Sequence, residues 1–367
     1  MAQRLEYTPA DDFYDVAWTA TERRDRYEYT TAVLADTPAA AARALHAAAR
    51  GEQPPAGAAA VRAATGNGPV FAFSGNGSQW PGMATALLRD EPVFRSAVDA
   101  VDAALAPLLG WSVIHELERP ADRSRLHLTE IAQPLLFAVQ IGQVRLLESH
   151  GVRPVAVVGH SVGEIAAAHV CGALDLPAAC QAVAARSRAQ APTAGQGRMA
   201  AVGLPADEMS KELAAYAGRL ELAGVNSPQD CTIAGDATAL TALGAELATR
   251  GVFFRELDLD YAFHSRAMDP IEEPLRAALS RLRPRPPRAP FVPTVTGGPA
   301  PGPRLDAAYW WHNVRRPVLF DQAVASLRDA GHDLFLSLVP PAALRPPPFA
   351  SPPPPVPPPL PLLSLRP

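Results

Sequence analysis

The sequence predicts an α/β protein whose large subdomain holds a parallel sheet and is interrupted by a smaller, ferredoxin-like subdomain. Residues 154–174, PVAVVGHSVGEIAAAHVCGAL, have the pattern of a buried strand, a sharp turn and a helix, which is typical of parallel sheets. A second buried-strand pattern, PVFAFSG at 69–75, stops at a glycine. Between Met199 and Asp260 the pattern gives the order β-α-β-β-α-β, which predicts the ferredoxin-like unit.

Composition and periodicity divide the chain into five segments. They are an N-terminal α/β linker unit at 1–65, the first part of the large subdomain at 66–197, the small subdomain at 198–260, the second part of the large subdomain at 261–338, and a proline-rich tail at 339–367. An alanine-driven helix in the first segment is expected to end near Gly51. Proline fixes φ and removes backbone donors, so we expect the tail to be polyproline-like or disordered.

Charge and composition limit the classes of partner. The net charge is −4, with basic residues scattered along the chain, so neither a nucleic acid nor a membrane surface is expected as a partner. No window reaches the roughly 18 consecutive apolar residues of a membrane span, and the N-terminus has no apolar signal-peptide core. Cys171, Cys180 and Cys231 form no CxxC pair, which favours a reducing, cytoplasmic location. Neither a P-loop nor metal-ligand spacing is present in the sequence.

The sharp turn at 159–163 carries the first candidate catalytic residue. Its residues, GHSVG, satisfy the GxSxG elbow pattern, in which two glycines permit a tight turn that exposes the hydroxyl of Ser161. This makes the large subdomain α/β-hydrolase-like. The backbone N–H of Val162 and the start of the next helix can then face a developing oxyanion. A purely structural strand-to-helix turn remains the alternative.

A nucleophilic serine needs a base, and His264 in DYAFHSRAMDP is the best candidate. The competing histidines are His160, His169, His312 and His332. A packed, non-catalytic histidine is the alternative interpretation.

Arg186 follows Ser161 by 25 residues, on the predicted next helix, and a guanidinium there could pair with a free carboxylate. A solvated surface arginine, like Arg188, is the alternative for this residue.

Several motifs in the same order resemble those of one family. FAFSGNGSQWPGM, GHSVGEIAAAHVCGALDL, the spacing to Arg186, YAFHS and WWHNVRRPVLF are similar to the motifs of acyltransferase domains in polyketide and fatty-acid synthases. The resemblance runs from about residue 66 to about 336. Residues 12–63 resemble the linker between a ketosynthase and its acyltransferase in type I synthases. The motifs look most like those of iterative bacterial synthases. The family's Gly-Pro-His segment after the LFL strand is reduced here to a trace.

The resemblance implies a role for particular residues. Ser161 would be the nucleophile and His264 its general base and acid, with the main-chain carbonyl of Asn313 orienting the imidazole. Arg186 would bind the free carboxylate of a malonyl-type substrate. The oxyanion hole would use the backbone N–H groups of Val162 and Asn76, the latter standing where family members usually carry glutamine.

The histidine motif also bears on substrate choice. The family's malonyl enzymes tend to have HAFH and its methylmalonyl enzymes YASH, whereas this chain has YAFH at Tyr261–His264, a mixture. Phe263 is expected to fill the space that a C2 methyl would need, and Val162 also fits the malonyl group. The resemblance therefore implies malonyl transfer, with a methylmalonyl-selective enzyme as the alternative.

The expected partners are malonyl-CoA, an acyl carrier protein with a phosphopantetheine thiol, and the neighbouring ketosynthase domain. Coenzyme A thioester is a substrate, and no permanently bound cofactor is expected. Two further alternatives remain. A serine hydrolase or thioesterase would need an acidic partner for its histidine, for which Asp258 and Asp260 are available. An inactive docking module would need none of these side chains.

Overall fold

The computed structural model describes residues 1–23, 29–50, 58–62, 68–298, 304–340 and 363–364. Contacts between residues divide the chain into two units, with the division after Asn67. Each unit is described by itself. Most of the predicted proline-rich tail, and the place of the family's Gly-Pro-His segment, lie outside the described residues.

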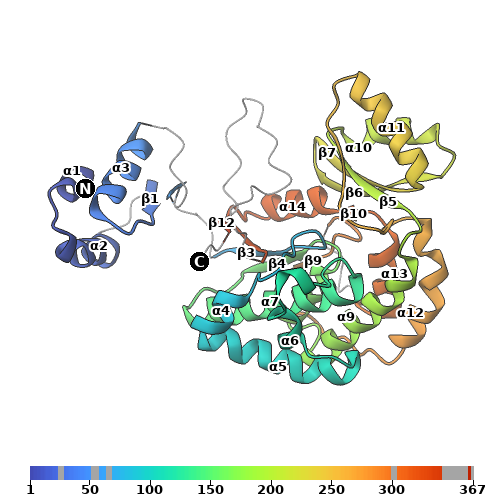
Figure 1. The fold of residues 1–367 in the computed structure, drawn as a ribbon, viewed down its shortest axis with the longest axis horizontal. Helices are drawn as coiled ribbons and strands as arrows, with labels where there is room; N and C mark the ends of the chain where they lie inside the picture. The colour runs from blue at the N-terminus through green and yellow to red at the C-terminus, as the bar shows by residue number, and fades with distance from the viewer. Residues whose placement is uncertain (24–28, 51–57, 63–67, 299–303, 341–362, 365–367) are drawn as a thin grey trace. The chain divides into compact units, whose positions relative to one another are not determined.

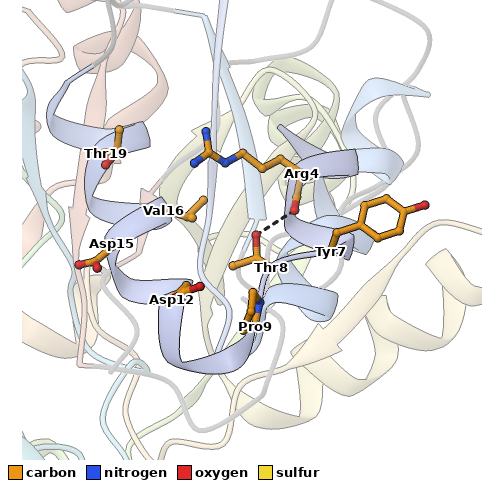
Figure 2. Close-up of a pocket in the computed structure, with 8 residues that line it drawn as sticks. All are labelled: Arg4, Tyr7, Thr8, Pro9, Asp12, Asp15, Val16 and Thr19. Carbon is orange, nitrogen blue, oxygen red and sulfur yellow. Dashed lines mark hydrogen bonds between the residues drawn. The ribbon is translucent and has the colours of Figure 1, made fainter.

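The first unit combines short helices with a two-stranded antiparallel sheet (Figure 1). Its elements are α1 (Ala2–Glu6), η1 (Ala10–Asp12), α2 (Phe13–Glu22), β1 (Tyr29–Val33), α3 (Pro38–Ala49) and β2 (Ala58–Arg62). The side chain of Thr37 accepts a hydrogen bond from the Ala40 N–H and so caps α3, whose first residue is a proline. Leu5, Ala41 and Ala42 form its small core. A surface depression along α1 and α2 is lined by residues between Arg4 and Thr19, and no predicted site residue takes part in it (Figure 2).

The second unit is built on a parallel sheet with the strand order β12-β11-β3-β4-β9. The strands are β3 (Val70–Phe73), β4 (Ala156–Gly159), β9 (Phe291–Val292), β11 (Phe335–Leu338) and β12 (Leu363–Ser364). Alternate residues of a strand face opposite sides of a sheet. Phe71 and Phe73 accordingly pack into the main core, whereas Val70 and Ala72 pack against helix α14 (Phe320–Asp329) on the other face.

Helices cover both faces of this sheet (Figure 1). They are α4 (Thr85–Asp90), α5 (Pro92–Leu109), α6 (Val113–Leu117), η2 (Ala121–Arg123), α7 (Thr129–Ser149), α8 (Gly163–Val170), α9 (Leu176–Gln190), η3 (Ala191–Thr193), η4 (Arg266–Ile271), α12 (Glu272–Ala278), α13 (Ala307–Arg315) and α14 (Phe320–Asp329). Helix α7 is buried along most of its length. Its Gln140 donates hydrogen bonds to the carbonyls of Ser74 and Leu338, which ties the helix to the ends of β3 and β11.

The small subdomain has its own five-stranded sheet, in the order β10-β6-β7-β5-β8. Its elements are β5 (Arg198–Val202), α10 (Ala206–Ala214), β6 (Leu220–Ser227), β7 (Asp230–Gly235), α11 (Ala237–Thr249) and β8 (Phe254–Glu256). The four strands between Arg198 and Glu256 pair antiparallel, with the first and third in the centre. The fifth strand, β10 (Val318–Leu319), comes from the later part of the large subdomain and pairs parallel with β6. The predicted α/β class, with a parallel sheet and a ferredoxin-like unit, is confirmed.

The turn between β4 and α8 explains both glycines of the elbow. A Cβ at position 159 would lie 2.3 Å from the backbone nitrogen of Glu164, and a Cβ at position 163 would lie 2.4 Å from the carbonyl oxygen of Phe73. Neither position therefore has room for a side chain. Between them, Ser161 has a φ of 55°, in the left-handed region that non-glycine residues rarely adopt.

We expect Gly163→Ala to destabilise the protein by about 1–3 kcal/mol, because the added methyl group must displace the backbone of β3. Chemical denaturation of the purified protein measures this difference. Gly298→Ala is the matched control, since a Cβ there meets no atom within 4 Å and the expected change is below about 0.5 kcal/mol. Equal unfolding midpoints for the two variants would show that the elbow is not tightly packed.

Candidate active site

Ser161 and His264 are in direct contact, although 103 residues separate them in the sequence. The Oγ atom of Ser161 lies 2.8 Å from Nε2 of His264, and both side chains are buried. Ser161 is held by the elbow after β4, and His264 lies just before η4 with a φ of 60°. Both residues therefore have left-handed backbone conformations, which are uncommon and are found preferentially at functional sites.

The contact made by Nδ1, the other ring nitrogen of His264, shows which of the two nitrogens carries the hydrogen. Nδ1 lies 2.9 Å from the carbonyl oxygen of Arg316. A carbonyl can only accept a hydrogen bond, so Nδ1 carries the hydrogen and Nε2 is free to accept the proton of Ser161. The orienting carbonyl belongs to Arg316 and not to Asn313, so that part of the sequence-based prediction was wrong. Helix α13 ends at Arg315, and the extended conformation of Arg316 leaves its carbonyl outside the helical hydrogen-bond pattern.

His264 is neutral near pH 7. Burial lowers its pKa from 6.5 to about 3, and the positive charge of Arg186 acts in the same direction. A neutral imidazole whose free Nε2 faces a serine hydroxyl is the arrangement that proton abstraction requires.

Arg186 points into the same site from helix α9, and its side chain is almost fully buried. Nη2 donates to Oγ of Ser161 at 2.9 Å, and Nε donates to Oδ1 of Asn313 at 3.1 Å. Nη1 donates to the amide oxygens of Gln133, at 2.6 Å, and Gln190, at 3.0 Å. Among the described residues, every acceptor of this guanidinium is an uncharged group.

Burial also affects the pKa of Arg186. It lowers the pKa to about 9, which leaves the group protonated at pH 7, and the nearby carboxylate of Glu164 opposes the shift. A buried cation that lacks a contacting anion is costly. The site is therefore electrostatically suited to an anionic group that comes from outside the protein.

Glu164 and Asn313 form the layer behind Arg186. The Asn313 amide nitrogen donates to the Ser161 carbonyl, at 3.1 Å, and to Glu164 Oε2, at 3.0 Å. Its oxygen is thereby turned toward Arg186. Glu164 is completely buried and also accepts hydrogen bonds from the backbone N–H and hydroxyl of Thr294 and from the hydroxyl of Tyr309. Burial raises the Glu164 pKa, and these hydrogen bonds oppose the increase.

Asn76 and Val162 are the residues predicted to form an oxyanion hole. Val162 directly follows Ser161, and Asn76 follows Gly75, where an added Cβ would lie 3.5 Å from the Cβ of Ser161. Val162 is the N-terminal cap residue of α8, where backbone N–H groups lack helical acceptors. Among the described loop and turn hydrogen bonds, neither backbone N–H is a donor. The Asn76 side chain donates to Thr129 at 3.4 Å, while its oxygen is buried without a partner in the described structure.

Tyr261 and Phe263 stack face to face beside His264, with ring centroids 4.8 Å apart and an angle of 9° between the planes. The Tyr261 hydroxyl accepts a hydrogen bond from the Thr129 N–H at the start of α7. Both rings are buried. The hydrogen bond fixes Tyr261, and the stacking fixes Phe263 in turn.

Among the described hydrogen bonds, none joins a competing histidine to the hydroxyl of Ser161. His160 lies 3.1 Å from the Asn226 oxygen on β6, and His169 Nδ1 lies 3.0 Å from the Leu174 carbonyl.

Three buried site residues were not predicted: Glu164, Gln133 and Gln190. Glu164 directly follows the elbow, and Gln190 follows Arg186 by one helical turn. The spacing of each from a predicted site residue could therefore have identified it from the sequence. Gln133 lies in an apolar stretch and offered no such signal.

Metal-binding clusters and membrane-spanning helices are both absent from the residues that the structure describes. These residues contain no group of three or more histidine, cysteine or acidic side chains arranged to hold a metal ion. Nor do they contain a helix with the length and apolar composition that a membrane span needs.

Known proteins are similar to this chain in sequence. Residues 70–345 match the acyl transferase domain family. The spectinabilin polyketide synthase system protein NorA' of Streptomyces orinoci is 40% identical over 347 residues, which cover 94% of this chain and 10% of that protein. Erythronolide synthase EryA2 of Saccharopolyspora erythraea is 38% identical over 341 residues, covering 93% of this chain and 10% of the synthase. The chain thus spans about a tenth of these curated relatives.

Solved structures agree with the sequence comparison. The acyltransferase domain from module 8 of the salinomycin polyketide synthase has a TM-score of 0.84 and 38% identity, and the match covers 93% of this chain and 81% of that one. A loading acyltransferase from the avermectin modular polyketide synthase has a TM-score of 0.72 and 40% identity, covering 75% of this chain and 88% of that one. The chain is an acyltransferase and belongs to the acyl transferase domain family.

Proposed function

We propose that this acyltransferase takes a malonyl unit from malonyl-CoA onto Ser161 and passes it to the phosphopantetheine thiol of an acyl carrier protein. The observation that carries the proposal is that Oγ of Ser161 contacts both a neutral imidazole and a buried guanidinium. The first can activate the hydroxyl, and the second can hold an acyl group that carries a carboxylate.

The first half-reaction acylates the enzyme. His264 Nε2 takes the proton from Ser161 as Oγ attacks the thioester carbonyl. The tetrahedral oxyanion receives hydrogen bonds from the backbone N–H groups of Val162 and Asn76. The carbon–sulfur bond then breaks, and the imidazolium returns its proton to the departing CoA thiolate. The product is an acyl-serine ester and free coenzyme A.

The second half-reaction reverses these roles with a different thiol. Nε2 of His264 removes the proton from the phosphopantetheine thiol, and the sulfur attacks the acyl-serine carbonyl. As the intermediate collapses, the Ser161 oxygen leaves and regains the proton from His264. Because one acyl-enzyme joins the two halves, the kinetics are expected to be ping-pong.

Arg186 favours a carboxylated acyl group over acetyl. Its Nη2 lies 2.9 Å from the atom to which the acyl group would be attached, so a malonyl carboxylate would be within its reach. An acetyl group brings no charge to offset the buried cation. For the C2 position, the bulk of Phe263, which Tyr261 keeps in place, supports malonyl over methylmalonyl.

The alternatives have less support. A hydrolase triad would need a carboxylate on Nδ1 of His264, but that nitrogen faces the carbonyl of Arg316. Asp258 and Asp260 are exposed, and Asp260 pairs with Arg198. An inactive docking module would not explain why Ser161, His264 and Arg186 converge.

We further propose that the chain is one acyltransferase unit of a modular synthase, with its N-terminal residues linking it to a ketosynthase. Solved relatives include domains of the modular avermectin synthase and of two salinomycin synthase modules. The expected iterative parent synthase has no support among these relatives. Matches that cover 93–94% of this chain include the N-terminal residues as well as the catalytic unit.

Ser161→Ala is expected to abolish acylation, because it removes the hydroxyl that contacts the base His264. Intact-protein mass spectrometry after incubation with malonyl-CoA measures the adduct. Ser149→Ala, which changes an exposed serine at the end of α7, should load like the wild type. A malonyl adduct on the Ser161→Ala protein would refute the assignment. Rapid release of free malonate without a carrier protein would indicate a hydrolase instead.

Phe263→Ser is expected to raise methylmalonyl loading relative to malonyl by about tenfold or more in the ratio of kcat/KM values, since one methyl group is worth about 1–3 kcal/mol. The reason is the space that the lost ring leaves next to Tyr261. Competition between the two CoA thioesters, followed by mass spectrometry of the acyl-enzyme, gives the ratio. Phe263→Leu keeps most of the bulk and should shift it much less. If the two variants have the same methylmalonyl-to-malonyl ratio, another residue selects the extender unit, and Val162 is the next position to test.

The acidic limb of the pH profile is expected to lie far below the pKa of an ordinary histidine. Because the His264 pKa is about 3, the base stays neutral and kcat/KM for acetyl loading should remain flat from pH 8 to about pH 5. Acetyl-CoA avoids titration of a substrate carboxylate. A midpoint near 6.5 would contradict the expected depression of the pKa.

The folded fraction must be checked in the same experiment. The unfolded chain protonates this histidine near pH 6.5 and the folded protein does not, so stability should decline as the pH falls below 6.5. Circular dichroism at each pH separates unfolding from a change in the chemistry.

A further inference from the structure

Gln190 is the last residue of α9 and lies one helical turn beyond Arg186, completely buried. Its Oε1 accepts hydrogen bonds from Nη1 of Arg186, at 3.0 Å, and from Nε2 of Gln133, at 2.7 Å. A guanidinium has donors only, so the Gln190 amide oxygen and not its nitrogen must face it. Gln190 therefore acts on Arg186 as a neutral acceptor.

The donors of Arg186 are nearly all engaged. A guanidinium has five N–H groups. Nε uses its single N–H on Asn313, Nη1 uses its two on Gln133 and Gln190, and Nη2 uses one of its two on Ser161. Within the described part of the chain, only one N–H, on Nη2, is left over. A carboxylate that binds in the two-pronged manner needs two parallel N–H groups. It must therefore displace one of the acceptors already present.

The acceptors differ in how firmly they are held. The Asn313 amide is fixed through its nitrogen by Glu164 and by the Ser161 carbonyl. The Gln133 amide nitrogen donates to Thr129 Oγ1 at 2.5 Å. The Gln190 amide nitrogen has a weaker partner, the Met268 sulfur at 3.7 Å. Of the three amides, Gln190 is held least firmly through its nitrogen, although its oxygen also accepts a hydrogen bond from Gln133, and we expect its contact with Arg186 to be the one that gives way.

We propose that Gln190 is a specificity-determining residue whose amide holds an Arg186 donor in the free enzyme and yields it to the carboxylate of the incoming acyl group. This inference rests on the proposed function, because it concerns the same carboxylate. Gln190 stabilises the buried cation when the site is empty, and it weakens binding of carboxylated substrates by the energy of the contact that they must break. An acyl group without a carboxylate does not displace Gln190, so its loading does not depend on this residue.

Two near-isosteric substitutions should change selectivity in opposite directions. Gln190→Met keeps the length of the side chain but removes the acceptor, so we expect the KM for malonyl-CoA to fall about three- to tenfold. Gln190→Glu keeps the shape but places a permanent anion against Arg186. Malonyl kcat/KM should then fall about 100-fold or more, since the internal carboxylate competes with the substrate's. Acetyl loading should change by no more than about threefold in either variant.

The experiment measures kcat and KM for malonyl-CoA and acetyl-CoA loading of the full chain, with thermal melts of each protein. Gln196→Glu, an exposed glutamine six residues further on, is the matched control for the added charge and should behave as the wild type does. Opposite shifts of the malonyl-to-acetyl ratio in the two Gln190 variants would support the inference. If Gln190→Glu does not fold, the malonyl KM of Gln190→Met decides the question alone.

Two results would overturn the inference, and they differ from failure of the proposed function. An unchanged ratio in variants that still load would show that Gln190 does not compete for Arg186. Equal losses of kcat/KM for malonyl and acetyl loading, together with a lower melting temperature, would show that Gln190 only stabilises the fold. If the wild-type chain takes no acyl group from any CoA thioester, the proposed function itself falls, and the inference with it.

Discussion

The buried charge of Arg186 is the constraint on which the rest of the site depends. A guanidinium inside a protein needs partners for its donors, and here neutral groups on three separate helices and on the elbow turn satisfy four of the five. Meeting that requirement brings α7, α9 and α13 together around Ser161. Burial is the main reason that the His264 pKa is low, and the charge of Arg186 acts in the same direction, so this residue both shapes the pocket and helps to keep the base neutral.

The elbow supplies the second constraint, which is steric. Its two glycines let α8 approach β4 and β3 so closely that backbone atoms occupy the space where side chains would be. Ser161 and His264 both carry left-handed backbone conformations, which only a tightly packed surrounding can maintain. The large core beneath them, together with Gln140 holding the ends of β3 and β11, provides that rigidity. Stability in this region is thus closely tied to catalytic geometry.

Motifs predicted the parts of the site that a local pattern or a resemblance can specify. The elbow pattern predicted Ser161. Local patterns offered His264 and Arg186 only as candidates, and the resemblance assigned their roles, since no periodicity could reveal their contacts with Ser161 across 103 and 25 residues. The orienting carbonyl was assigned to the wrong residue because it depends on where α13 ends, and helix boundaries are poorly encoded in sequence. Gln133 escaped notice because a single glutamine in an apolar helix has no motif. Gln190 could have been singled out from its spacing to Arg186, but its role arises only from tertiary contact.

Strand β10 sets a practical boundary for recombining this domain with its relatives. Although it pairs with β6 of the small sheet, its two residues come from the other end of the domain's sequence, between α13 and α14. A graft that exchanges only residues 198–256 would place a foreign edge strand against Val318 and Leu319. Arg316, whose carbonyl orients His264, lies just two residues before that pairing. Mismatched hydrogen bonds at a peripheral sheet edge would therefore be transmitted directly to the catalytic base, so chimeras should exchange both segments together.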